Sequence, residues 1–147
     1  MTNAMNRCNP LVFFYGSFIN LDVLGEVGIS PEPGAIETGS LTGFDIVADP
    51  LASLVPSDDS VVWGILVRVG HTKLDELYGQ PWVGSYLPEA VLVRRRGGAF
   101  VPAMTYISPV SGKPAAAGDY IGRIVDGAKQ AGFPAWYIAR LEQLREG

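Results

Sequence analysis

The chain has 147 residues, of which 48% are hydrophobic and 18% are charged, and its formal net charge is −4. This composition is typical of a globular chain, and the acidic balance gives no reason to expect nucleic acid, which needs a basic face. With one cysteine, Cys8, and one histidine, His71, the chain has no internal disulfide and cannot by itself supply a usual structural zinc site. Because no apolar run approaches ~20 residues and no signal-peptide core is present, we expect a cytoplasmic protein without membrane contact.

The length allows one domain with a single core. We expect a flexible, polar N-terminal tail over residues 1–10 and one domain over residues 11–147. Eighteen glycines and eleven prolines along the chain predict many short elements joined by turns.

The first elements alternate between apolar and turn-rich stretches. The run LVFFY over 11–15 predicts a buried strand. A weak helix is expected over 20–27, with Asn20 as its N-cap. Residues 28–40 read as mainly loop, and 41–48 as a second strand.

The middle of the chain carries the clearest strand. Residues 49–60 contain Pro, Ser and Asp and predict a turn-rich connection. The strand follows over 61–69, where Gly64 indicates a bulge or a close backbone approach. A short helix over 72–78 comes next, with Thr72 as the expected N-cap.

The last part changes from strands to helices. Two strands, 88–95 and 100–108, are joined by a Gly-Gly turn, which is a hairpin signal. Apolar residues then follow a helical period over 119–131, and a second helical stripe runs over 134–144. Strands first and helices last, without βαβ alternation, predict an α+β fold whose mixed or antiparallel sheet can curl into a barrel.

One turn is a candidate ligand site. In FFYGSF, residues 13–18, a buried strand stops at Tyr15-Gly16-Ser17, which leaves backbone N–H groups beyond the end of the ladder. Glycine allows a ligand to approach closely, and turned N–H groups favour a carboxylate or a developing oxyanion. An ordinary strand-ending turn remains the alternative.

Four stretches carry a family resemblance. They are YGS (15–17), ASLVP (52–56), VVWGILVRV with LDELYG (61–79) and GDYIGRIVDGAKQAGFPAWYIARLEQL (118–144). Their order and spacing over about residues 11–144 are similar to those of the motifs of the gamma-glutamylcyclotransferase-like or AIG2-like family.

The resemblance implies a small mixed β-barrel with flanking and C-terminal helices, and no cofactor. It also implies chemistry in which the α-amine of a gamma-glutamyl substrate attacks the γ-amide carbonyl and releases 5-oxoproline. On this basis the backbone around Gly16, Ser17 and Phe18 would hold the carboxylate or the reacting carbonyl. Tyr106 falls at a tyrosine of the family and would line the same pocket. We expect Tyr15, at the start of the YGS motif, to contribute to it as well.

The sequence departs from the family at its catalytic residue. The resemblance places the catalytic glutamate in the motif L-D-x-x-E-G, and aligning Leu74, Asp75 and Gly79 puts Tyr78 at that position. A phenol has a pKa of about 10, so about one molecule in a thousand is ionised at pH 7, and its use as a base costs roughly 4 kcal/mol. A neutral tyrosine still serves as a hydrogen-bond donor and general acid.

Nearby side chains are possible substitutes. We expect a structural role for Asp75 and an outward direction for Glu76. Glu89 reaches the pocket only if the preceding loop folds inward, and it would then bind substrate or act as the base. Trp82 lies in that loop and is a candidate pocket wall.

Three functions fit these observations. The favoured one is an enzyme on this scaffold, a cyclotransferase-like acyl transferase or lyase. It would use Tyr78 as general acid or base on a small polar metabolite, for example a biosynthetic intermediate. The second is a catalytically silent binding protein. The third is a true cyclotransferase whose glutamate has been substituted or is supplied by Glu89.

Overall fold

The computed structural model describes residues 9–48, 51–79, 86–109 and 119–144. The elements follow one another from strands to helices, with two short 3₁₀ helices, η1 and η2, in the first third of the chain. In order they are β1 (Leu11–Phe14), η1 (Ser17–Ile19), α2 (Leu21–Glu26), η2 (Pro33–Ala35), β2 (Glu37–Ala48), β3 (Ala52–Arg68), α3 (His71–Tyr78), β4 (Leu87–Arg95), β5 (Phe100–Ile107), α4 (Tyr120–Ala131) and α5 (Ala135–Gln143).

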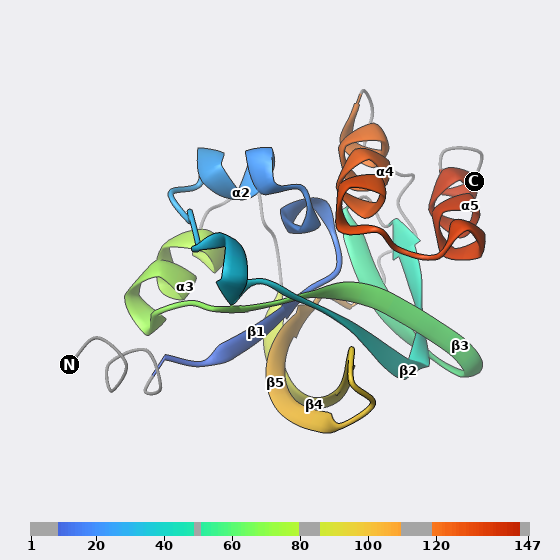
Figure 1. Ribbon diagram of the computed structural model, residues 1–147, viewed down its shortest axis with the longest axis horizontal. Coiled ribbons are helices and arrows are strands. Elements are labelled where there is room, and N and C mark those ends of the chain that lie inside the picture. Colours follow the sequence, from blue (N-terminus) through green and yellow to red (C-terminus); the bar gives the residue numbers. More distant parts are fainter. Residues whose placement is uncertain (1–8, 49–50, 80–85, 110–118, 145–147) are drawn as a thin grey trace.

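The five strands form a closed barrel in the order β1-β3-β2-β4-β5. All neighbours are antiparallel except β1 and β5, which run parallel and pair at Val12 and Met104. The expected α+β fold with a mixed barrel is therefore confirmed. Figure 1 shows α2 and α4 on the same side of the barrel and the long β2–β3 hairpin curving beneath α5. In the part of the chain that the structure describes, no helix is long and apolar enough to cross a membrane.

The turn-rich connection expected over 49–60 is wrong for most of its length, because β3 begins at Ala52. The polar residues of this stretch fit into the β2–β3 ladder through a β-bulge. Between Thr42 and Phe44 of β2, the partner in β3 changes from Val61 to Pro56, so three extra residues fit into β3. Pro and Ser residues are compatible with a strand where a bulge interrupts the hydrogen bonds. By the same pairing with β3, β2 starts at Glu37, inside the stretch expected to be mainly loop.

Two helix ends carry the capping residues that their sequences favour, and one expected cap is wrong. The Asn20 side chain accepts bonds from the first turn of α2, as expected of an N-cap. Gly132 ends α4 in the left-handed region, with φ of 75°. The expected cap at Thr72 is wrong, because α3 begins at His71 and its N-cap is Gly70.

Packing around the end of β1 fixes where the strand stops. Gly64 was expected to mark a bulge or a close approach, and a Cβ built there would lie 2.3 Å from the carbonyl oxygen of Phe14. Thr105 of β5 is fully buried, and its hydroxyl donates to the carbonyl of Phe13 at 2.9 Å. The end of β1 is therefore closely packed against β3 and β5. This packing sets the position at which the YGS turn begins.

The described part of the expected N-terminal tail is attached to the barrel. The carbonyl of Pro10 accepts from the N–H of Val69 at 3.1 Å, and the carbonyl of Asn9 accepts from Arg68 at 2.8 Å. Residues 1–8, and Cys8 with them, lie outside the described residues.

Candidate functional site

A small cavity of about 60 Å³ lies where β1 ends. Six segments converge on it: the end of β1 with its turn, the start of β3, the end of α3, the residue before β4, β5 and the start of α4. Five of the six tyrosines of the chain are among its walls. The lining residues are Phe13, Phe14, Tyr15, Gly16, Ser17, Phe18, Leu51, Ala52, Tyr78, Tyr86, Tyr106 and Tyr120.

Tyr78 is packed into this site by aromatic contacts. Its ring stacks on Tyr106 with the centroids 3.7 Å apart and the planes 10° from parallel. The ring of Tyr86 lies farther away, at 6.1 Å and 48°. Stacked aromatic pairs stabilise a structure beyond the area that they bury, so Tyr78 is held in one orientation at the pocket.

Three of the tyrosine hydroxyls hold backbone groups. Tyr15 donates to the carbonyl of Tyr106 at 2.5 Å. The backbone of Ala52 is clamped from both sides, because its N–H donates to the Tyr120 hydroxyl at 2.9 Å and its carbonyl accepts from Tyr86. Within the described part of the chain, the hydroxyls of Tyr78 and Tyr106 make no hydrogen bond, so these two are the phenols available to a ligand.

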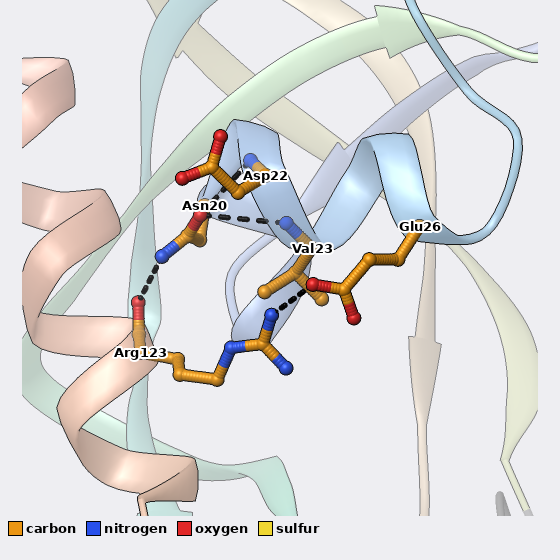
Figure 2. A network of polar contacts seen from close by, with 5 residues as sticks. All are labelled: Asn20, Asp22, Val23, Glu26 and Arg123. Atoms are coloured by element: carbon orange, nitrogen blue, oxygen red, sulfur yellow. Dashed lines mark hydrogen bonds and ion pairs between the residues drawn. The ribbon is translucent and has the colours of Figure 1, made fainter.

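The YGS turn is supported from behind by α4. Asn20, buried just after η1, donates from Nδ2 to the carbonyl of Arg123 at 3.0 Å. The same side chain accepts from the N–H groups of Asp22 and Val23 (Figure 2). A Cβ at Gly127 of α4 would lie 2.7 Å from the backbone nitrogen of Asn20. The close approach of two backbones therefore places the turn that forms one wall of the cavity.

The pocket keeps its phenols neutral. Burial raises the pKa of Tyr78 far above the ordinary value of about 10, and the neighbouring Tyr106 and Tyr86 raise it further. Burial likewise raises the pKa of Tyr15 and of Tyr120. None of the lining side chains that the structure describes carries a carboxylate, an amine, a guanidinium or an imidazole. Near neutral pH the described walls of this site therefore offer neutral donors and backbone amides rather than a base.

The structure brings most of the expected site residues together. Tyr15, Gly16, Ser17 and Phe18 form one wall, and Tyr78 and Tyr106 form another. Trp82 lies outside the described residues.

The expected substitutes for the glutamate lie elsewhere. Glu89 is exposed on β4 and borders a different depression, so it is not brought to Tyr78. Glu76 forms an ion pair with Lys73 at 3.0 Å on the surface of α3. Asp75 is exposed, and its charge contributes after burial to the raised pKa of Tyr106. Among the described residues no group of three or more His, Cys, Asp or Glu is arranged to hold a metal ion.

Sequence reasoning did not assign a role to Tyr86, Tyr120 or the 51–52 backbone. Tyr120 and Ala52 lie inside two of the stretches that carry the family resemblance, and this was the available signal. Tyr86 follows an undescribed segment and lies outside the quoted motifs.

The chain belongs to the AIG2-like family, whose profile matches residues 61–141. The matched region includes β3 from Val61 onward, Tyr78, Tyr106 and most of the C-terminal helices. No curated protein matches the chain.

Solved structures share the fold. A structure described as gamma-glutamyl cyclotransferase matches with a TM-score of 0.74 and 21% identity, covering 91% of this chain and 86% of its own. YkqA from Bacillus subtilis matches with a TM-score of 0.76 and 19% identity, and the match covers 97% of this chain and 56% of the YkqA chain. A yeast gamma-glutamyl cyclotransferase specific to glutathione matches with a TM-score of 0.64 and 13% identity. The match covers 94% of this chain and 96% of the yeast chain.

Proposed function

We propose that the chain is an enzyme of the gamma-glutamylcyclotransferase type that acts on a small amide- or amino-acid-like metabolite. Tyr78 is its general acid, and the backbone of residues 15–18 is its anion or oxyanion site. The observation that carries this proposal is that Tyr78 and the residues of the YGS turn line the same cavity. The family membership and the fold of the cyclotransferases support it. The cytoplasm remains the compartment that we expect from the single cysteine.

The raised pKa decides which proton transfer Tyr78 performs. A phenol with a pKa above 10 is fully protonated near neutrality, so it donates to a leaving nitrogen and does not deprotonate an ammonium. The substrate then reacts from its free-amine form. The amine attacks the carbonyl carbon, the C–N bond breaks, the leaving nitrogen takes the phenol proton, and the attacking nitrogen returns a proton to Tyr78.

This route predicts a distinct pH dependence. Turnover rises with pH above neutrality, as the substrate amine loses its proton, and levels off once the amine is neutral. A carboxylate base would instead place the acidic limb of the profile at the pKa of that carboxyl group. The profile of kcat/KM with pH separates the two cases.

The test is release of 5-oxoproline from a panel of gamma-glutamyl amides and amines, followed by mass spectrometry. Tyr78→Phe removes the hydroxyl and keeps the ring that stacks on Tyr106, so turnover should fall by about 10²-fold or more while ligand-induced thermal shifts persist. Tyr137→Phe is the matched control, because this buried tyrosine does not line the cavity. Full turnover in Tyr78→Phe, or an equal loss in Tyr137→Phe, would contradict the proposed role.

A binding protein without catalysis is the second candidate, and it is favoured by the lack of an ionisable base among the described lining residues. It predicts no turnover of any substrate in the panel, together with a thermal shift that is lost when the pocket is altered. Tyr78→Glu distinguishes the third case, a cyclotransferase scaffold that lacks only its carboxylate. Release of 5-oxoproline that appears only in Tyr78→Glu identifies that case.

A further inference from the structure

A second cavity, of about 570 Å³, shares no residue with the tyrosine-lined one. It lies between the end of β4, its turn into β5, two residues of β2 and the connection from α4 to α5. The residues that matter for its chemistry are Arg94, Arg95, Arg96, Thr38, Ser40 and Trp63. We propose that this groove, called here the arginine groove, binds a small molecule that carries a phosphate or diphosphate group.

The charge of the arginine groove is opposite to that of the whole chain. The chain has 11 basic and 15 acidic residues, yet three consecutive arginines line this one cavity. Arg95 is already used, since its guanidinium holds Glu37 through two nitrogens at 2.8 to 3.2 Å. In the described part of the chain, Arg94 and Arg96 have no carboxylate within ion-pair distance. No described carboxylate therefore neutralises these two guanidinium groups, and both can meet an anion.

Arg94 and Arg96 are suited to the same ligand. Arg94 lies near the end of β4 and Arg96 in the turn that follows, and both line the groove. A guanidinium group can bind a phosphate group through two parallel N–H···O hydrogen bonds. Charge-assisted hydrogen bonds of this kind are about twice as strong as hydrogen bonds between neutral groups. Arg95, which lies between them in sequence, pairs with Glu37 and so attaches the end of β4 to the start of β2.

The other polar groups of the arginine groove include donors that suit a phosphate. Thr38 and Ser40 alternate along β2 and so present hydroxyls on one face. Trp63 also lines the groove, and its Nε1 is buried without a hydrogen-bond partner in the part of the chain that the structure describes. A buried donor without an acceptor is costly, and an ionised phosphate oxygen that reached this N–H would supply the missing acceptor.

The dimensions favour a small ligand over a nucleic acid. A volume of about 570 Å³ lies within the range of small-molecule sites. Nucleic acid binding uses many phosphate contacts across a broad basic face, whereas this chain is acidic and has two free arginines here. A mono- or diphosphate matches two guanidinium groups and the nearby hydroxyls.

The test uses inorganic phosphate and pyrophosphate as probes, with calorimetry at constant ionic strength. Arg94→Gln combined with Arg96→Gln should weaken pyrophosphate binding by at least 10-fold. The indole N–H signal of Trp63 should shift on titration of the original chain and not of this double variant. That signal is assigned by its disappearance in Trp63→Phe. Arg68→Gln is the control, because Arg68 is an exposed arginine outside the arginine groove.

Three outcomes would overturn the proposal. The first is no binding of either probe at millimolar concentration, and the second is an equal loss in Arg68→Gln. The third is tighter binding of a short DNA duplex than of pyrophosphate through the same two arginines, which would identify a nucleic-acid surface instead. Both arginines are exposed, so circular dichroism should show that the double variant keeps its fold.

Discussion

Tyr78 and Tyr106 stack face to face, with centroids 3.7 Å apart and planes 10° from parallel. Tyr78 is the last residue of α3, and Tyr106 lies in β5, so this contact attaches the end of the helix to the barrel. Tyr78, which we expect at the position of the family's glutamate, is thus part of the wall. A substitution at 78 changes both the chemistry of the pocket and its packing, and the two effects must be measured separately.

The energy of this contact is measurable by a double-mutant cycle. Tyr78→Leu and Tyr106→Leu, singly and together, should give a coupling free energy of about 0.5–1.5 kcal/mol in urea unfolding. The parallel cycle of Tyr78→Leu with Tyr137→Leu should be additive, because these two rings share no contact in the described structure. A coupling indistinguishable from zero in the first cycle would show that the stacking contributes no stability.

The buried tyrosines predict a loss of stability at alkaline pH. Burial raises the folded-state pKa of five of them above the unfolded value of about 10. They are Tyr15, Tyr78, Tyr106, Tyr120 and Tyr137. A raised folded pKa means that the stabilisation is complete below pH 10 and is lost as pH rises above it, because the unfolded chain releases its protons first.

Absorbance of tyrosinate at 295 nm, together with urea unfolding between pH 8 and 12, tests this dependence. These tyrosines should stay protonated in the folded protein past pH 10, and the free energy of unfolding should decline above that pH. In Tyr78→Phe the decline should be shallower by about 1.4 kcal/mol per pH unit, which is the contribution of one proton. Ionisation of all six tyrosines near pH 10 in the folded protein would contradict the burial argument.

Local patterns predicted the parts of the fold that depend on local chemistry. Asn20 precedes an apolar helix as a cap should, and Gly64 interrupts a strand where another backbone comes close. The turn predicted over 52–60 was wrong, because Pro56 and the Ser-Asp run are residue types typical of turns but lie in β3. Only the pairing with β2, and the bulge beside Gly43, shows that these residues extend a strand.

The candidate site was predictable where the motifs were contiguous. The YGS turn, Tyr78 and Tyr106 were expected together, and they line one cavity. Tyr86 and Tyr120 come from distant parts of the chain and reach the cavity by holding the backbone of Ala52. No local pattern predicts such contacts, since they depend on how the barrel closes.

Gly64 should tolerate no side chain. In Gly64→Ala the new Cβ would meet the carbonyl of Phe14 at 2.3 Å and the ring of Phe13 at 2.6 Å, so backbone must move. We expect a loss of about 1–3 kcal/mol in the free energy of unfolding, and weaker ligand binding because the YGS turn follows directly. Gly25→Ala in α2 is the control. No atom lies within 4 Å of its built Cβ, and stability should rise by about 0.5–1 kcal/mol.

Asn20 joins the cap of α2 to α4, and graded substitutions separate the two roles. Asn20→Ala removes the cap and the bond to the carbonyl of Arg123, so unfolding should become easier by about 1.5–3 kcal/mol. Asn20→Ser keeps an acceptor for the helix end and loses only the bond across to α4, so about half of that loss should remain. Glu26→Gln removes the exposed ion pair with Arg123 and should cost less than about 0.5 kcal/mol.

Ligand binding distinguishes a structural role of Asn20 from a role in positioning the pocket. Because Asn20 follows η1, loss of its bond to α4 should loosen the YGS turn and weaken ligand binding in both Asn20→Ala and Asn20→Ser. Glu26→Gln leaves the turn seated and should bind as the original chain does. Equal ligand affinity in all three variants would show that the asparagine does not position the YGS turn. The position of the turn would then depend only on the close approach of Gly127 and on the packing of the barrel.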